Sequence, residues 1–269
     1  MNLSLCIATF NEENNIHYPL DSVYDLVDEV IIVDGGSTDK TVEKAKAYGS
    51  KVKVFIEDNP AMFHINKQKA IERAKGEWIL QLDADEGLSD ELKKEIKKTL
   101  PLPLNPSPLA FYLPRKNWFL SRFLMKGGQY PDYTIRLYKN GVAKFPRKDV
   151  HENVEIKTSP NIPSLIKEGS KGVVGYLNNP ILHYADPTFE RYLTRWNRYT
   201  TLDANLLIEK GQKINFFDYF FLKPTVWFLT TYIRHKGFMD GFPGFVFSLF
   251  SSIRFWVVYI KWWKIKHSP

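Results

Sequence analysis

Short apolar runs alternate with amphipathic stretches through the first hundred residues of the chain. The apolar runs are typical of buried strands and cover residues 3–8, 29–33, 52–56 and 78–82. The stretches between them have helical periodicity, over residues 16–26, 41–48 and 64–75, and Gly76 ends the last of these. Because strands and helices alternate in this order, we predict an α/β fold with a mostly parallel sheet, right-handed crossovers and helices on both faces.

The pattern changes after residue 100. Four prolines within residues 100–108 prevent a helix there and indicate a surface connector. Further strands are predicted over 109–113 and 173–184, and a hairpin over 136–145 around Asn140-Gly141. Helical periodicity returns at residue 188 and is clearest over 188–210. We therefore expect two halves of one α/β domain, 1–100 and 101–186, followed by a helical, aromatic-rich extension over 187–269.

The composition narrows the class of protein. The chain has 269 residues with 44% hydrophobic content, which is enough for one substantial core and an appendage. Its single cysteine, Cys6, lies in an apolar run, so we expect a buried structural thiol and no disulfide within the chain. The first ten residues lack a basic leader, so no signal peptide is expected. The composition suits a reducing compartment, and we expect a cytoplasmic location.

The last third of the chain is basic and aromatic, and it accounts for much of the net charge of +7. Residues 244–263 are apolar enough to raise the question of a membrane span, but Arg254 lies in their middle. The sequence better fits a helix in the lipid headgroup region. Its aromatic and basic residues are Trp256, Tyr259, Lys261, Trp262, Trp263 and Lys264. A helix packed on the protein body and a dimer interface are the alternatives.

Candidate chemistry gathers where three predicted strands end. The fourth strand ends at Asp83-Ala84-Asp85, the first is followed by residues 8–13, and the second by residues 33–41. In open α/β sheets, ligands bind at the carboxyl ends of the strands. Two carboxylates there are suited to Mg²⁺ or Mn²⁺, which often share their ligands with substrate phosphates.

The loop after the second strand suggests a nucleotide. Gly35 and Gly36 would permit close backbone approach to a ligand, and Asp34 could accept hydrogen bonds from ribose or base. Asp39 is placed to cap the following helix. No Gly-x-Gly-x-x-Gly fingerprint follows the first strand, and no Walker loop is present. A nucleotide diphosphate would therefore be held by side chains and a metal.

Three motifs occur in order: Ala-Thr-Phe-Asn-Glu-Glu at 8–13, Val-Asp-Gly-Gly-Ser-Thr-Asp-Lys-Thr at 33–41, and Ala-Lys-Gly-Glu-Trp-Ile-Leu-Gln-Leu-Asp-Ala-Asp-Glu at 74–86. Together they resemble the family-2 glycosyltransferases, over residues 3 to about 98. The resemblance implies the GT-A fold and transfer of a sugar from a nucleotide-sugar with inversion. It also implies a set of nucleoside-pocket residues, Thr9, Asn11, Glu12 and Asp34, and a divalent cation bound by Asp83 and Asp85.

The second half resembles one branch of that family. Residues 130–138 and 150–152, with 221–224 and 236–241 further on, are similar to the branch that includes lipopolysaccharide core glucosyltransferases. The second loop begins Asp-Gly-Gly where many members have Asp-Asp, so one carboxylate contact on the uracil side is missing. His183 resembles the downstream histidine that completes metal or diphosphate binding in some GT-A enzymes; a structural role is the alternative.

Direct displacement needs a base, a stabilised leaving group and reactants held in line. Glu152, with His151 beside it, is the candidate base, although it could be a surface carboxylate; Asp132 is the second choice. Arg136 could hold a phosphate through a bidentate contact or form a structural ion pair. Lys67 could approach the nucleotide or be a solvated cation on its helix.

The resulting prediction is an inverting, metal-assisted glycosyltransferase. Its partners would be a nucleotide-diphosphate sugar, a glycan or lipid-linked acceptor of the cell envelope, and the inner face of the membrane; nucleic acid is not expected. A polyprenyl-phosphate sugar synthase and a peptide glycosyltransferase are alternatives within the same chemistry. A non-catalytic nucleotide-sugar-binding module is the alternative of a different class. The donor sugar, the acceptor and the oligomeric state are left open.

Overall fold

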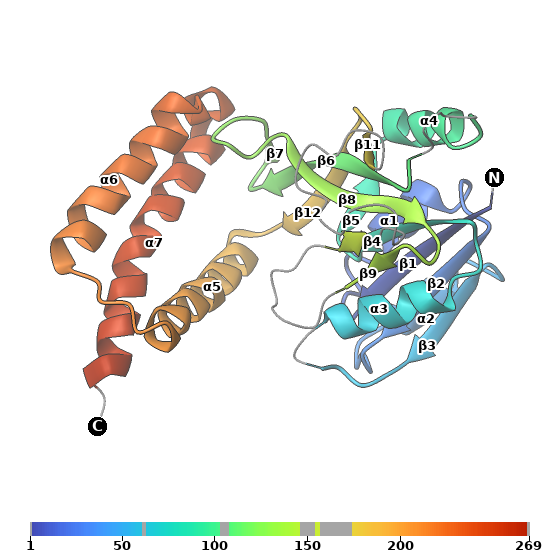
Figure 1. Ribbon diagram of the computed structural model, residues 1–269, viewed down its shortest axis with the longest axis horizontal. Helices are drawn as coiled ribbons and strands as arrows, with labels where there is room; N and C mark the ends of the chain where they lie inside the picture. The colour runs from blue at the N-terminus through green and yellow to red at the C-terminus, as the bar shows by residue number, and fades with distance from the viewer. Residues whose placement is uncertain (1, 61–62, 103–107, 146–153, 157–173, 268–269) are drawn as a thin grey trace, which may run out of the picture. The chain divides into compact units, whose positions relative to one another are not determined.

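The computed structural model describes residues 2–60, 63–102, 108–145, 154–156 and 174–267 (Figure 1). The chain forms two compact units. The first contains Met1–Arg115 and Asp132–His183, and the second contains Lys116–Pro131 and Tyr184–Pro269. We describe each unit separately.

The four predicted strands form the parallel part of one large sheet. They are β1 (Leu3–Thr9), β2 (Glu29–Asp34), β3 (Val52–Ile56) and β4 (Trp78–Asp83), in the spatial order β3-β2-β1-β4. The side chains of β1, β2 and β4 are buried on both faces, as expected for strands under covering helices. The prediction of a buried strand is wrong for β3, which is the last strand at one edge of the sheet and has no fully buried residue. The predicted parallel arrangement is confirmed.

Antiparallel strands extend the sheet beyond β4. The order continues β8 (Asp132–Lys139), β6 (Ala110–Phe119), β12 (Ile181–Asp186) and β5 (Glu86–Leu88), with β7 (Arg122–Leu124) and β11 (Val174–Tyr176) paired to β6. A separate pair is formed by β9 (Ala143–Lys144) and β10 (Glu155–Ile156). The stretch 173–184, predicted as one strand, contains parts of two.

The predicted hairpin at Asn140-Gly141 is wrong, although the turn itself is present. Gly141 has φ 82°, and the Val142 N–H donates to the Lys139 carbonyl at 3.4 Å. However, β8 pairs with β4 on one side and β6 on the other, so neither of its edges is left for β9. The strand after the turn therefore pairs with β10.

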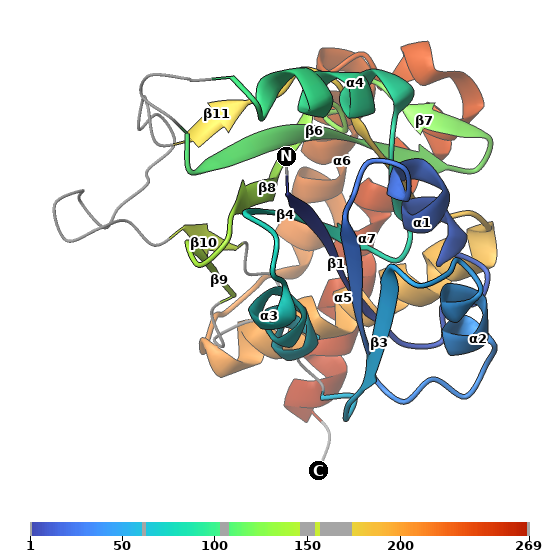
Figure 2. The same ribbon diagram turned by 90° about the vertical axis from the view of Figure 1, so that its right-hand side faces the viewer.

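Helices cover both faces of the parallel strands (Figure 2). They are α1 (His17–Val23), α2 (Thr41–Lys46), α3 (His64–Arg73) and α4 (Asp90–Thr99). Leu5 and Ile7 of β1 point into a core shared with α1, α2 and α4, whereas Cys6 points into a core shared with α3. Burial raises the pKa of the Cys6 thiol, which fits the inert structural role expected. The first three helices are shorter than predicted, and α4 was not predicted.

The second unit is the helical, aromatic-rich region expected. Its helices are α5 (Phe189–Glu209), α6 (Lys223–Phe228) and α7 (Gly241–His267). Two π-helical segments, η1 (Asp218–Leu222) and η2 (Leu229–Arg234), continue α6 at its two ends, and a 3₁₀ turn, η3 (Gly237–Asp240), leads into α7. Helix α7 contacts α5, α6, η1 and η2, and therefore forms the centre of this unit.

The residues expected at a membrane on α7 are divided between surface and core. Trp263 is 51% exposed, but Trp262 is 6% exposed and packs with Val258. Lys261 donates hydrogen bonds of 2.7–2.8 Å to the Asn197 carbonyl and side chain and to the hydroxyls of Thr200 and Thr201 on α5. Lys261 thus joins α5 to α7.

One helical stretch of the described chain, Gly237–His267, is long and apolar enough to cross a membrane by length and composition alone. A core helix of a soluble protein passes the same test, and 33% of its most apolar window is buried. Packing against α5 and α6 is one physical reason for this apolar composition.

Candidate active site

The ends of β1, β2 and β4 lie side by side at one edge of the sheet. Thr9 is paired with Asp34, and Ala8 with Asp83, in parallel register. The three loops predicted to share an edge therefore do so. Their side chains converge because parallel strands place their carboxyl ends together.

Hydrogen bonds join the loops after β1 and β2. The Asn11 N–H donates to Ser37 Oγ at 2.8 Å, and the Thr38 N–H donates to Asn11 Oδ1 at 2.8 Å. Asn11 adopts a positive φ of 53°, which asparagine tolerates better than most residues. The Glu12 N–H donates to Thr41 Oγ1 at 2.8 Å, and the Glu12 carboxylate accepts from Asn15. Asn11 and Glu12 thus hold the loops after β1 and β2 together at this edge.

Asp34 organises the glycine-containing loop that follows it. Its fully buried carboxylate accepts hydrogen bonds from the Gly36 N–H at 3.0 Å, the Ser37 N–H at 2.7 Å and the Ser37 hydroxyl at 2.6 Å. Gly36 has φ 78°, and a Cβ at Gly35 would lie 3.1 Å from the Asn59 side chain. The glycines are therefore required by the backbone and by this close approach.

Thr9 and Asp39 lie on either side of that loop. Thr9 is 5% exposed, and its Oγ1 has no hydrogen-bond partner among the residues that the structure describes. A buried hydroxyl without a partner is uncommon and suits a ligand contact. Asp39 accepts from the Thr41 N–H at 2.9 Å and so contacts the first residue of α2, but the N-cap position is Lys40, whose side chain makes no capping hydrogen bond.

Asp83 is the centre of a buried network of charges. Its Oδ1 pairs with Lys67, and its Oδ2 accepts from Arg136 Nη2 at 2.8 Å. Lys67 has 7% of its side chain exposed, so the alternative of a solvated cation is wrong. Arg136 also donates to Glu86 Oε1 at 2.9 Å and to Gln81. Arg136 is thus a partner of the carboxylates, as its structural alternative predicted.

These contacts fix the charge states of the network. Burial raises the pKa of Asp83, but the Arg136 guanidinium and the Lys67 ammonium outweigh it and hold that pKa well below its usual range. Burial likewise opposes ionisation of Glu86, yet Arg136 and Arg115 leave its pKa lowered. Burial lowers the pKa of Lys67, although Asp83 raises it. Asp83 and Glu86 are therefore carboxylates at neutral pH.

Three members of this network were missed from the sequence. Glu86 is fully buried, and its Oε2 accepts the Asp83 N–H at 2.9 Å. Arg115 donates to Glu86 at 3.2 Å. Gln81 donates to Asp83 at 3.2 Å. Two of them carried a signal: Gln81 interrupts an apolar strand, and Glu86 directly follows the Asp-x-Asp pair.

Asp85 and His183 lie together beside this network. His183 Nε2 is 3.6 Å from Asp85 Oδ1, and the side chains are 13% and 16% exposed. The antiparallel pairing of β12 with β5 brings His183 opposite Glu86, and so next to the turn that carries Asp85. Burial lowers the pKa of His183, although the Asp85 carboxylate raises it. His183, predicted as a metal or diphosphate ligand with Asp83 and Asp85, thus lies in contact with Asp85.

Of the two candidate bases, Asp132 lies among the described residues and Glu152 does not. Asp132 begins β8 and accepts from Arg115 Nη2 at 2.7 Å and Nε at 3.0 Å, with 38% of its side chain exposed. Glu152 and His151 lie outside the described residues.

The side chains around Asp83 and Asp85 meet only some of the requirements of a divalent-cation site. No cluster of three or more His, Cys, Asp or Glu is arranged to hold a metal among the described residues. Both oxygens of Asp83 have cationic partners, and Asp85 Oδ1 lies 3.6 Å from His183 Nε2, so that a carboxylate oxygen and an imidazole nitrogen are neighbours beside the network. Mg²⁺ sites with one or two carboxylates are commonly completed by substrate phosphates.

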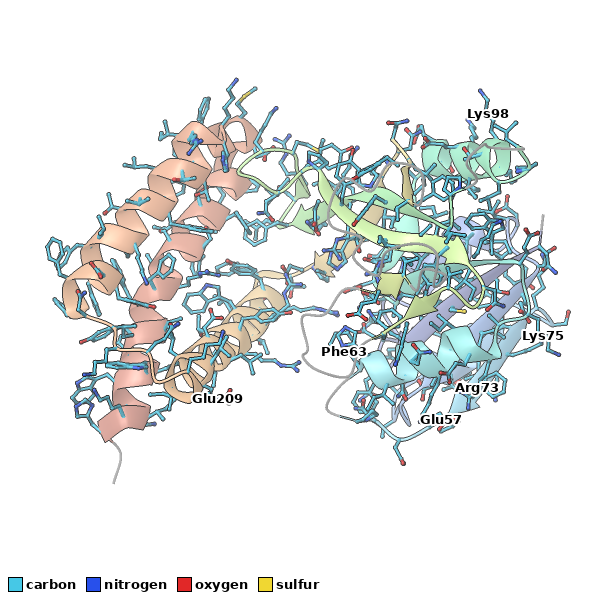
Figure 3. All side chains as sticks on the ribbon, viewed as in Figure 1. Glu57, Phe63, Arg73, Lys75, Lys98 and Glu209 are labelled. Atoms are coloured by element: carbon cyan, nitrogen blue, oxygen red, sulfur yellow. The ribbon has the colours of Figure 1, made fainter. Side chains whose placement is uncertain are left out.

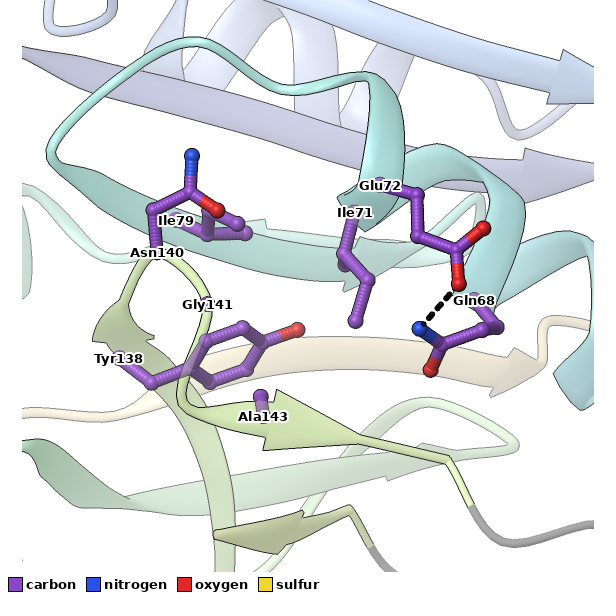
Figure 4. Close-up of a pocket in the computed structure, with 8 residues that line it drawn as sticks. All are labelled: Gln68, Ile71, Glu72, Ile79, Tyr138, Asn140, Gly141 and Ala143. Atoms are coloured by element: carbon purple, nitrogen blue, oxygen red, sulfur yellow. Dashed lines mark hydrogen bonds between the residues drawn. The ribbon is translucent and has the colours of Figure 1, made fainter. Parts of the chain in front are cut away.

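A separate pocket of about 170 Å³ lies beside α3 (Figure 4). It is lined by Gln68, Ile71, Glu72, Ile79, Tyr138, Asn140, Gly141 and Ala143. Ile79 is near the start of β4 and Asp83 is at its end, so this pocket is at the opposite end of the strand from the charge network. None of the predicted site residues lines it.

Comparisons with known proteins agree with this geometry. The sequence model described as Glycosyl transferase family 2 matches residues 4–100. An uncharacterized glycosyltransferase of Rickettsia typhi is 31% identical over 262 residues, with 94% of this chain and 84% of the relative covered. The lipopolysaccharide core biosynthesis glycosyltransferase LpsC of Rhizobium meliloti is 26% identical over 262 residues, covering 93% and 88%.

A solved structure is also similar. The S. aureus TarS 1-349 crystal structure in complex with UDP-GlcNAc aligns with a TM-score of 0.48 and 16% identity, covering 95% of this chain and 81% of that one. The predicted family and its mostly parallel α/β fold are confirmed. The match to the Rickettsia typhi relative, which covers 94% of this chain and 84% of the relative, and the match to the family over 4–100 show that this chain belongs to glycosyl transferase family 2.

Proposed function

We propose that this glycosyltransferase moves a sugar from a nucleotide-diphosphate sugar to an acceptor hydroxyl by a single displacement with inversion. The observation that carries the proposal is the convergence of Thr9, Asp34, Asp83 and Asp85 at the ends of three parallel strands. The buried Thr9 hydroxyl and the loop held by Asp34 offer a place for the nucleoside. Asn11 and Glu12 keep that loop in position.

Asp85 and His183 would hold the divalent cation, Mn²⁺ or Mg²⁺. When bound, the cation neutralises charge that develops on the departing diphosphate. Asp83 is fixed by Lys67 and Arg136, and its N–H by Glu86, so the turn carrying Asp85 is held at the end of β4. In this proposal Lys67 and Arg136 are positioning residues, which act through Asp83.

The reaction requires a base on the acceptor side. The base removes the proton of the acceptor hydroxyl, the acceptor oxygen bonds to the anomeric carbon, and the diphosphate oxygen leaves with the electron pair. Glu152 remains our proposed base. Asp132 is the second choice, because its carboxylate is already paired with Arg115.

We further propose that the acceptor is a cell-envelope glycan or a lipid-linked saccharide, and that the enzyme works in the cytoplasm at the membrane surface. Similarity to LpsC over 93% of the chain supports a lipopolysaccharide core acceptor. The apolar surface of the second unit supports a membrane-borne acceptor.

Nucleotide release from a panel of UDP-, GDP- and dTDP-sugars, with added Mn²⁺, tests the proposal. The full chain should release nucleotide from one donor class, and Asp85→Ala should lose this metal-dependent turnover with an unchanged circular dichroism spectrum. Asp25→Ala is the matched control, because Asp25 is a surface carboxylate paired with Lys93. Full turnover in Asp85→Ala would refute the metal assignment. Glu152→Gln should stop turnover while donor binding, measured by calorimetry, survives.

A further inference from the structure

One side of the helical arm made of η1, α6 and η2 is apolar and exposed. Six large apolar side chains, each more than half exposed, form a row along it: Phe217, Phe221, Leu222, Val226, Leu229 and Ile233. We call this row the apolar face. The turns of η1 and η2 are π-helical and therefore wider than the α-helical turns of α6, so spacings of three to five residues keep these side chains on one side.

The opposite side of the same arm is already occupied. Tyr219, Pro224 and Thr231 are buried, and the arm packs on α7 along its length. Trp256 of α7 donates its indole N–H to the Phe220 carbonyl at 2.8 Å. Figure 3 shows side chains projecting from α6 on the side away from α7. Within the second unit, then, the apolar face is not part of the core.

The apolar face continues into an apolar tip with a basic border. Arg234, His235 and Lys236 are exposed where η2 ends. Directly after them, Phe238, Met239 and Phe242 are 49%, 54% and 71% exposed. Monomeric soluble proteins rarely expose contiguous apolar surface on this scale, so a binding role is indicated.

The charge of the residues around the apolar face distinguishes among the surfaces that could cover this face. Residues 211–267 contain eight lysines and arginines but only two acidic residues, Asp218 and Asp240. Asp240 is buried and accepts the N–H groups of Met125 and Lys126, at 3.0 and 2.7 Å. A second copy would bring two basic borders together, whereas an anionic lipid surface complements them.

We propose that the apolar face and its tip lie in the headgroup region of an anionic lipid bilayer, with Arg234 and Lys236 at the lipid phosphates. This deepens the membrane association proposed above and rests on it. Trp227, 39% exposed, and Arg254, which stacks over it at 5.3 Å, add the aromatic and cationic character typical of an interfacial helix. The arm, more than the tryptophans at the end of α7, then makes the contact.

Flotation of the full chain with phosphatidylcholine vesicles, with and without phosphatidylglycerol, tests this inference without any sugar donor. The protein should bind only vesicles that contain phosphatidylglycerol and should be released by high salt. The triple variant Phe221→Ser, Val226→Ser, Leu229→Ser should lower the partition coefficient at least about tenfold, because each apolar group inserted contributes to binding. The control triple Leu102→Ser, Tyr199→Ser, Leu206→Ser removes similarly exposed side chains elsewhere and should bind normally.

Several results would overturn the inference. These are normal vesicle binding by the Phe221 triple variant, equal binding to vesicles without phosphatidylglycerol, and resistance to salt and alkaline carbonate, which would indicate a spanning helix. A dimer in analytical ultracentrifugation that the same triple variant converts to monomer would assign the face to a second copy. Donor hydrolysis measured in parallel separates this inference from the sugar-transfer proposal, since neither triple variant alters the site around Asp85.

Discussion

In the first unit, charged side chains are buried around Asp83, whereas in the second unit large apolar side chains are exposed along α6. Both arrangements oppose the usual distribution of residues between core and surface. The buried charges are tolerated because each has an opposite charge or hydrogen-bond partner. The exposed apolar groups have no such compensation within their unit. The buried charges can all be paired within the folded chain, but the exposed apolar side chains imply a binding partner outside the chain.

If the buried network depends on mutual pairing, removing one cation should have the largest effect on stability. Arg136→Met would leave Asp83 and Glu86 with fewer opposing charges in a buried site. We expect the free energy of unfolding to fall by about 3–5 kcal/mol, the usual cost of breaking a buried pair. Urea denaturation followed by circular dichroism measures it. A loss within the error of the measurement would mean that water already solvates these carboxylates.

Within the second unit, the hydrogen bonds of Lys261 are the polar contacts that we expect to contribute most to the free energy of unfolding. Lys261→Met keeps the apolar stem but removes the hydrogen bonds to Asn197, Thr200 and Thr201 of α5. We expect a loss of about 1–3 kcal/mol in the free energy of unfolding, from hydrogen bonds to a charged group. Lys264→Met is the control, since Lys264 is exposed on the same helix. Equal effects of the two substitutions would show that the positive charge of the side chain, and not its hydrogen bonds to α5, stabilises the helices.

In the first unit, we expect Glu29 to make a smaller contribution to the free energy of unfolding, and one that depends on pH. Burial raises its pKa, but hydrogen bonds from the Lys75 N–H and Ser4 and the charge of Lys53 leave that pKa below its ordinary value of 4.5. The stabilisation is therefore present above pH 4.5 and is lost as the pH falls through the folded-state pKa. Glu29→Gln should lose about 1 kcal/mol at pH 7. Thermal melting at pH 7 and at decreasing pH should show the difference from wild type shrinking; a constant difference would contradict this.

The smallest effect on stability is expected on the apolar face. Phe221→Ser replaces a side chain that is 54% exposed, so the free energy of unfolding should change by no more than about 0.5 kcal/mol. The same substitution should weaken vesicle binding measurably. A large loss of stability in urea would show that the apolar face belongs to the core, and the contrast between the units would then fail.

The sequence predicts the fold of residues 1–100 well because its signals are local. Apolar runs that end in Asp34 and in Asp83 identify both the strands and the edge at which they meet. The sequence predicts Lys67 and Arg136 as candidate site residues, but their pairing with Asp83 depends on tertiary packing of α3 and β8 and is not visible in spacing. The structure excludes a solvated Lys67, one of the alternatives that the sequence left open.

Other features escaped prediction for identifiable reasons. Asn140-Gly141 is a strong local hairpin signal, but the neighbouring strands compete for both edges of β8. Arg115 lies inside a long strand with no motif around it, so only the fold brings it to Glu86. On α7, helical periodicity does not show which aromatic residues α5 and α6 will cover.

In the function proposed above, Asp85 and His183 hold a divalent cation together with a nucleotide diphosphate. Electron paramagnetic resonance of Mn²⁺ titrated into the full chain, with and without UDP, tests it directly without turnover. We predict that Mn²⁺ is bound tightly only when UDP is present, and that Asp85→Asn and His183→Gln each abolish this binding while Asp25→Asn leaves it intact. Unchanged Mn²⁺ binding in both Asp85→Asn and His183→Gln would contradict the account.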